Sequence, residues 1–547
     1  MRTLTLSLSK GALLIAALAV LCSGCSKSGA PGAAPPSNGV LRVGLWAEPN
    51  SLNPLLASNT AEDFIAALAF SMLVTIDNHG RDVPDLAAAV PTLENGGISK
   101  DGLTITYHLR RNVKWQDGAP FTSADVKFSW QAVMNPDNNV VERRGYDQVQ
   151  SVDTPDPYTV VFHLKRPFAP FVDTVFGESD DPYRVIPRHL LARYKNINQV
   201  PFNQLPIGTG PFKVTRWIHG DRIEYVANPY YFLGKPKLRA ITVYIVPDSN
   251  TAEAELRAHN LDLVPDVATA NLSNLRERPA PGVTTMLVPG PVYSAIQFNL
   301  THPPLDDVRV RRALSYGIDE KRIIDTLLYG SGVPATADLA DFYWAYDGNV
   351  TRYPYDPAKA RAMLDSAGWL VGPGGIRRKN GRALSLQLVY GQGNATARQM
   401  GVQIQSDLRK IGVDVSVKDY TYTMLYATQA LGGILDGGKF DLAEYLWVAG
   451  ADPDDSDGWM CDAAPPAGNN VAHYCNPQFD AAERDALTHV DRTRRKSDYA
   501  KTQALLASDA PAAFQYYQRL RYALSTNVQN FRPNGVTASW NAYEWSL

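Results

Sequence analysis

Side chains that could do chemistry are plentiful in this sequence, but they are not spaced for catalysis. None of the patterns His-Glu-x-x-His, Gly-x-Ser-x-Gly or the phosphate-loop signature is present. The pair Gly208 and Gly210 lacks the third Gly and the Lys-Ser/Thr pair of a phosphate loop. The nine His residues are scattered, and acid pairs such as Asp454-Asp455 stand at turn positions where capping explains them. We therefore expect that the protein is not an enzyme and that it has no metal site and no cofactor. A catalytic triad, however, is a spatial arrangement that need not form a sequence motif.

The first 24 residues have the layout of an export signal. Arg2 and Lys10 are positive, and the apolar run 11–21 is too short to span a bilayer comfortably. The run ends in Leu-Cys-Ser-Gly-Cys, which resembles a bacterial lipobox with Cys25 as the lipidated residue and Cys22 where Leu is usual. A plain secretory signal is the alternative. Residues 25–39 are rich in Pro, Gly, Ala and Ser and are predicted to form a flexible tether.

Two further cysteines, Cys461 and Cys475, flank a stretch without periodicity. In an exported protein we expect them to form a disulfide, and closing so short a loop contributes about 3 kcal/mol in the chain-entropy model. A metal site that uses His473 and Asp462 is the alternative, but four ligands at zinc spacing are absent.

Composition sets the frame for the fold. The chain has 547 residues, of which 45% are hydrophobic and 20% charged, as in ordinary soluble globular proteins. The net charge of -2 argues against a nucleic-acid partner, which would favour a clustered basic surface. The length exceeds what one core usually organises, so two or three lobes are expected.

The best specified local structure lies in residues 101–130. Apolar residues at 103, 105, 107 and 109 alternate with polar ones, which predicts a half-buried strand. Gly118 marks a turn. Thr122 and Asp125 are spaced as a capping box, which predicts a helix that begins just after Thr122.

The run Val113–Val126, VKWQDGAPFTSADV, closely resembles the cluster-5 family of extracytoplasmic solute-binding proteins, the peptide-binding type that serves ABC importers. The runs Ile207–Phe212 and Gln297–Leu314 also match this family, and the resemblance covers residues 40–547.

The resemblance implies an α/β fold with mixed sheets: a clamshell of the periplasmic-binding-protein type (type II, cluster C), with two main lobes and an inserted third lobe. Lobe I would combine 40–76, 200–292 and 520–547, lobe II would be 77–199, and lobe III 293–519. Within lobe III, periodicity predicts helix 356–367, strand 384–390, helix 395–411, strand 413–418, helix 421–431 and strand 440–447.

The function implied is the capture of a small solute, most simply a peptide, between lobes I and III. Hinge closure would precede delivery to the permease and ATPase subunits of an importer. We expect a monomer outside the cytoplasm, in the periplasm or at the cell surface, held at the membrane by its lipid. The alternatives are a nickel chelate, oligosaccharide, opine or antibiotic as ligand, an exported hydrolase, or an adhesion or chaperone-like role without an importer.

Four residues are predicted to contact the ligand. Asn53 lies in a loop that resembles one lining the family's cleft, and Tyr445 and Trp447 lie in the segment that carries the family's cleft Trp. Peptide-binding relatives place an Asp, which pairs with the peptide's amino group, a few residues after that Trp, and here Gly450 stands at its position. Asp452 either slips back into this role or serves a structural turn, because it precedes Pro.

Overall fold

The computed structural model describes residues 38–57 and 59–547. The predicted export signal, Cys25 and most of the tether lie outside these residues. Among the residues described, no helix combines the length and the apolar composition that crossing a membrane requires. The terms lobe I, lobe II and lobe III keep the residue ranges given above.

The stretch 101–130 folds as its pattern predicts. β4 (Thr104–His108) buries Ile105 and Tyr107 and leaves His108 exposed. α2 (Ser123–Met134) starts with the predicted capping box, in which the Thr122 side chain accepts from the helix and Asp125 accepts from the Thr122 backbone N–H. This reciprocal bonding satisfies two backbone donors that the first helical turn leaves without partners.

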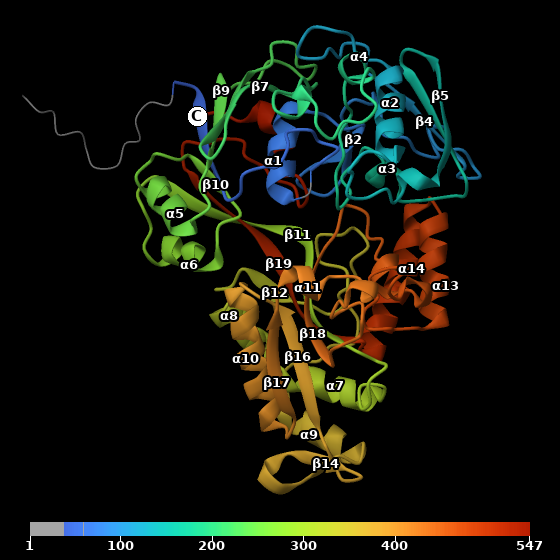
Figure 1. The fold of residues 1–547 in the computed structure, drawn as a ribbon, viewed down its shortest axis with the longest axis vertical. Helices are drawn as coiled ribbons and strands as arrows, with labels where there is room; N and C mark the ends of the chain where they lie inside the picture. The colour runs from blue at the N-terminus through green and yellow to red at the C-terminus, as the bar shows by residue number, and fades with distance from the viewer. Residues whose placement is uncertain (1–37, 58) are drawn as a thin grey trace, which may run out of the picture.

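One large mixed sheet runs through both halves of the molecule (Figure 1). β1 pairs in parallel with β9 and β10, and β16 pairs in parallel with β17 and β18, whereas the remaining pairs are antiparallel. In spatial order its strands are β17 (Asp414–Tyr420), β16 (Ser385–Gly391), β18 (Leu442–Val448), β11 (Val283–Phe298), β19 (Ala512–Ser525), β10 (Leu263–Pro265), β1 (Val40–Leu45), β9 (Ala240–Ile245), β8 (Arg222–Ala227) and β7 (Phe212–Ile218), with β12 (Gly332–Pro334) against β19.

The two longest strands of this sheet, β11 and β19, join the halves. The first part of β11 pairs with the end of β19 in lobe I, and its second part pairs with the start of β19 in lobe III. Between them the register shifts, from Pro289 opposite Arg519 to Tyr293 opposite Tyr517. An irregular ladder bends a strand pair locally, and Figure 1 shows β11 and β19 passing from the upper to the lower body at this level.

Two hydrophobic interiors lie on either side of this crossing. Lobes I and II share one core, which extends from Leu41 through Trp115 and Phe162 to Trp545. Lobe III has its own clusters, one around α7 (Val308–Gly317) and α10 (Ala395–Lys410) and another around α13 (Pro477–Thr488) and α14 (Arg492–Asp509). An α/β fold with mixed sheets is thus confirmed.

The helices and smaller sheets cover these cores. The helices are α1 (Thr60–Ala69), α2, α3 (Phe171–Thr174), α4 (Arg188–Leu191), α5 (Ser249–Arg257), α6 (Thr269–Glu277), α7 (Val308–Gly317), α8 (Glu320–Thr326), α9 (Pro357–Ser366), α10 (Ala395–Lys410), α11 (Tyr422–Leu425), α12 (Ser456–Trp459), α13 (Pro477–Thr488) and α14 (Arg492–Asp509). The small sheets are β4 with β6 (Thr159–Leu164) and β5 (Val149–Asp156), β2 (Val74–Ile76) with β3 (Asp82–Pro84), and β13 (Leu370–Val371) with β14 (Arg377–Lys379) and β15 (Arg382–Ala383).

The predicted helix 421–431 is wrong in extent. α11 is a single turn, Tyr422–Leu425, followed by a separate 3₁₀ turn, Gln429–Leu431. The chain then folds back so tightly that a Cβ on Gly433 would lie 1.7 Å from the carbonyl oxygen of Ala427. The helix itself is interrupted at Thr428, whose backbone is extended (φ -61°, ψ 156°) between the two turns.

Two of the family-like runs meet in the structure through one side chain. The Gln116 side-chain amide donates to the carbonyl oxygens of Ala69, Gly210 and Phe212, and its oxygen accepts from the Gly208 N–H. A Cβ on Gly208 would lie 1.8 Å from the Ala69 carbonyl oxygen. The glycines therefore serve close packing against the end of α1, not phosphate binding.

Candidate functional site

A small cavity of about 40 Å³ lies where lobe II meets lobe III. It is smaller than the about 150 Å³ of an engineered cavity that admits benzene, whereas a hollow of about 550 Å³ beside it lies between the same lobes. This position differs from the one that the family resemblance predicts, which is between lobes I and III. The residues that line this interlobe cavity come from lobe II (Glu142, Arg144, Tyr146, Phe168, Asp173, Thr174, Ser179, Asp180, Asp181, Tyr183) and lobe III (Trp447, Ala449, Gly450, Asp452, Asp454).

Polar contacts hold the two lobes together around the cavity. Arg144 of lobe II forms an ion pair of 2.5 Å with Asp454 of lobe III. Two backbone hydrogen bonds of 2.7 Å also cross the boundary, from Ala451 to Glu178 and from Ala169 to Leu487. The second of these bonds joins the segment before α3 to α13, and Figure 1 shows α13 and α14 below α3. The structure therefore represents a closed arrangement of lobes II and III.

The backbone at Gly450 lies close to the main chain of lobe II. A Cβ at this position would lie 2.6 Å from the carbonyl carbon of Ser179 and 2.7 Å from the carbonyl oxygen of Glu178. The main chain of lobe II thus occupies the space that a side chain at position 450 would need.

Tyr445 and Trp447 lie on β18, as predicted. Their rings stack at 5.9 Å with an interplanar angle of 15°. Tyr445 is buried, whereas Trp447 is half-buried and lines the interlobe cavity. The Nε1–H of Trp447 is shielded from solvent and finds no acceptor among the residues that the structure describes. A buried donor without an acceptor is costly, which makes this indole a candidate donor to a ligand.

One edge of β18 is open near Trp447. In the part of the chain that the structure describes, β11 pairs with every residue of β18, whereas on the other side of β18 the strand β16 pairs only with Leu442 and Ala443. The Ala449 N–H donates to Pro291 on the β11 side. Because successive residues of a strand alternate, Val448 and Leu446 direct their N–H and C=O groups to the open edge. Val448 and Leu446 are exposed residues, at 47% and 40%.

Asp452 lines the cavity, but its carboxylate is already engaged. Both oxygens bind Arg495, at 2.7 and 2.6 Å, and the side chains of both residues are buried. One of the same oxygens accepts the N–H of Asp454. These contacts favour the structural role for Asp452, and its role as the ligand's amine anchor stays a prediction.

Asn53 is not brought to this cavity. Its side chain is buried in lobe I, where the amide donates to Asn203 and the oxygen accepts from Leu55. These bonds hold the loop in place. A direct ligand contact by Asn53 therefore stays a prediction that no contact here supports.

Carboxyl groups of lobe II are the site residues that sequence reasoning missed. Burial, followed by the nearby carboxylates of Asp180 and Glu142, raises the pKa of Asp181 to about 6. Burial, followed by Asp82 and Asp452, raises the pKa of Asp173 well above its usual range. The adjacent acids at 180–181 were a signal, but only the fold shows that they line the same cavity as Trp447.

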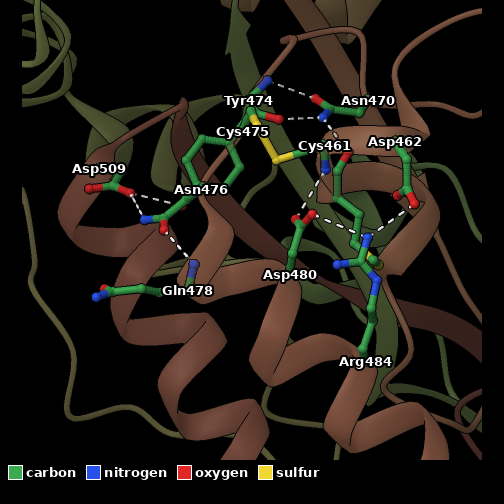
Figure 2. The surroundings of a disulfide bond; sticks show 11 residues. Cys461, Asp462, Asn470, Tyr474, Cys475, Asn476, Gln478, Asp480, Arg484 and Asp509 are labelled. Atoms are coloured by element: carbon green, nitrogen blue, oxygen red, sulfur yellow. Dashed lines mark hydrogen bonds and ion pairs between the residues drawn. A yellow bond between two sulfur atoms is a disulfide. The ribbon is translucent and has the colours of Figure 1, made fainter.

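In lobe III, the loop between α12 and α13 is closed by a disulfide between Cys461 and Cys475 (Figure 2). The Cys461 N–H donates to Asp480 on α13, and Asn470 inside the loop donates to the carbonyl oxygens of Met460 and Tyr474. The bridge thereby fixes the chain between α12 and α13. Among the described residues, no group of three or more His, Cys, Asp or Glu could hold a metal ion.

Comparisons with known proteins agree on one family. The pattern that describes bacterial extracellular solute-binding proteins, family 5, matches residues 83–469. The oligopeptide-binding protein AppA of Bacillus subtilis is 28% identical over 97% of this chain and 97% of that protein.

Two solved structures are similar in fold and in sequence. Bacillus subtilis AppA in complex with a nonapeptide has a TM-score of 0.73 at 26% identity, covering 93% of this chain and 98% of that chain. NikZ from Campylobacter jejuni in complex with Ni(L-His) has a TM-score of 0.76 at 29% identity, covering 93% of this chain and 100% of that chain.

Proposed function

This chain belongs to family 5 of the bacterial extracellular solute-binding proteins, and we propose that the solute it captures for an ABC importer is a peptide. The observation that carries this proposal is the open edge of β18 beside Trp447. An extended peptide can add to such an edge through main-chain hydrogen bonds, with an aromatic ring packing on it. The similarity to AppA supports the same class of ligand.

Capture would couple to a movement of the lobes. We place the hinge where β11 and β19 change register, between Pro289 and Tyr293, because this strand pair crosses from lobe I to lobe III. A ligand favours the closed arrangement only by binding it more tightly than the open one. The closed monomer would then be recognised by permease and ATPase subunits of the importer.

The β18 edge can be tested with proline. Val448→Pro removes one N–H from the open edge, and proline is tolerated in strands at such edges. We expect peptide affinity to fall at least about tenfold, measured by calorimetry with di- to nonapeptides, while the melting temperature changes little. Val448→Thr, which keeps the N–H, should bind as the parent does.

The same titrations separate the alternatives. Unchanged peptide affinity in both Val448→Pro and Leu446→Pro would refute binding at this edge. Binding of a nickel–histidine chelate in the absence of peptide binding would replace the peptide as the solute. Recovery of the peptide cut into fragments would indicate a hydrolase.

We also propose that a lipid on Cys25 holds the protein at the outer side of a membrane, since 21–25 resembles a lipobox. Several acyl chains make a stable anchor where a single chain binds only marginally. Cys25→Ala should move the protein from the membrane fraction to the soluble fraction on cell fractionation. Retention of this variant at the membrane would contradict the proposal.

A further inference from the structure

The end of lobe III that lies away from lobes I and II is strongly basic. We call residues 357–383, which form α9 and the small sheet of β13, β14 and β15, the lobe III tip. Figure 1 shows α9 and β14 at the lower end of the molecule. The tip contains six Lys or Arg residues and a single acid, Asp365, in a chain whose net charge is -2. Such a local excess creates a positive field that attracts anionic surfaces.

A buried arginine fixes the tip to the body of lobe III. The side chain of Arg377 is 1% exposed and donates to the carbonyl oxygens of Ile411 and Trp369. It also forms an ion pair of 2.5 Å with Asp365. The acid of the tip is therefore already neutralised, and the hairpin that carries the other charges is held beside the end of α10.

Three exposed arginines of the tip, Arg361, Arg378 and Arg382, have no carboxylate partner among the residues that the structure describes. Acids at the neighbouring ends of α7 and α10 are each matched by a cation of their own. These pairs are Asp307 with Arg309, Asp407 with Lys410 and Asp414 with Arg409. The three guanidinium groups therefore remain free to bind an external anion.

The same small sheet exposes two adjacent aliphatic side chains. Leu370 and Val371 form β13, an outer strand of the sheet, and they are 62% and 66% exposed. Leu370 lies opposite Arg378 in the antiparallel ladder, so these two side chains share one face. An exposed aliphatic edge strand is a liability unless a surface covers it. Basic side chains around an apolar pair suit a membrane surface, where charges meet headgroups and aliphatic groups enter the acyl boundary.

We propose that the lobe III tip binds an anionic phospholipid surface, with Arg361, Arg378 and Arg382 on lipid phosphates and Leu370 and Val371 at the acyl boundary. A stable protein interface buries about 800 Å² on each side, whereas a bilayer can be bound by a few charges and two aliphatic side chains.

This contact would orient the molecule. The described chain begins in lobe I, where β1 pairs with β9, and Figure 1 shows β9 at the end opposite to the tip. A protein held at a membrane near its first strand and also at the lobe III tip would lie with its long axis along the surface. The inference does not depend on which solute is captured.

Co-sedimentation with vesicles tests the inference. The protein used is residues 26–547, which keep every described residue and lack Cys25, so that no lipid on that residue can mediate binding. We expect it to sediment with vesicles of equal parts phosphatidylglycerol and phosphatidylcholine but not with phosphatidylcholine alone. Raising the salt from about 0.05 M to about 0.5 M should release it, because salt screens exposed charges.

Two variants of the tip should weaken this binding. The triple change Arg361→Gln, Arg378→Gln and Arg382→Gln should lower it about a hundredfold, since each basic residue near an anionic surface contributes about fivefold. Leu370→Ser with Val371→Ser should lower it at least about tenfold. Both variants change only exposed side chains, so the melting temperature and the peptide affinity should stay those of the parent.

A matched control removes three exposed cations of lobe II. Lys100, Arg111 and Arg193 form no ion pair within 38–57 and 59–547, and replacing all three by Gln should leave vesicle binding unchanged. An equal loss in this control would show attraction by overall charge and would overturn the inference. Failure of the parent to sediment with the anionic vesicles would also overturn it. Binding only to phosphatidylcholine vesicles that contain the permease would overturn it in favour of a protein partner.

Discussion

Replacing Asp452 by Ala is expected to destabilise the protein by about 3–5 kcal/mol, because it leaves a buried guanidinium without its counter-ion. Arg495 is 7% exposed in its side chain and donates to both Asp452 oxygens. Its remaining hydrogen bonds, to the Ala486 carbonyl and the Tyr499 hydroxyl, are to neutral groups. Urea unfolding followed by tryptophan fluorescence measures the loss, as a shift of the transition that reports lobe III.

Two comparisons make this prediction specific. Asp414 forms an ion pair of 3.1 Å with Arg409 in which both side chains are more than half exposed, so Asp414→Ala should cost no more than about 1 kcal/mol. The double change Asp452→Ala with Arg495→Met removes both charges and should recover much of the stability. If Asp452→Ala unfolds as the parent does but no longer binds peptides, Asp452 is a ligand anchor and the structural role is wrong.

Local structure was predictable wherever short-range chemistry decides it. The alternation in 103–109 and the capping box of Thr122 and Asp125 specify a strand and a helix start within a few residues. The predicted helix 421–431 failed because the backbone is extended at Thr428, which periodicity does not report. The function of Gln116 was also hidden, since its partners lie at Ala69, Gly208 and Gly210.

The candidate site was predictable only in part, because several of its contacts join residues that are far apart in the sequence. Trp447 could be predicted as a candidate site residue, because the residues around it in the sequence resemble the segment that carries the family's cleft Trp. Asp180 and Asp181 reach the cavity only through the docking of lobe II on lobe III, and no pattern in 77–199 specifies that docking. The bond between Asp452 and Arg495 spans 43 residues, so its sequence context could suggest a turn but could not show the ion pair.

Gly450→Ala is expected to weaken peptide binding about a hundredfold without destabilising the open protein. The added Cβ would lie 2.6 Å from Ser179 and 2.7 Å from Glu178, distances that the rigid main chain of lobe II cannot relieve by a rotamer change. The lobes would then stop short of closure, with loss of the Ala451 to Glu178 hydrogen bond and the Arg144 to Asp454 ion pair. Each such contact contributes about 1.5 kcal/mol, and every 1.4 kcal/mol is a factor of ten in affinity.

Small-angle scattering and calorimetry together test this expectation. With saturating peptide, the parent should contract to the closed arrangement, whereas Gly450→Ala should remain more extended. The unfolding midpoint without peptide is the control, and it should match that of the parent because the new methyl group meets lobe II only on closure. Parent-like contraction and affinity in Gly450→Ala would show that lobe II does not close against this residue. The ligand shifts the equilibrium between the open and closed arrangements only by binding the closed one more tightly. A steric block to closure at Gly450 should therefore lower the affinity without changing any direct contact with the ligand.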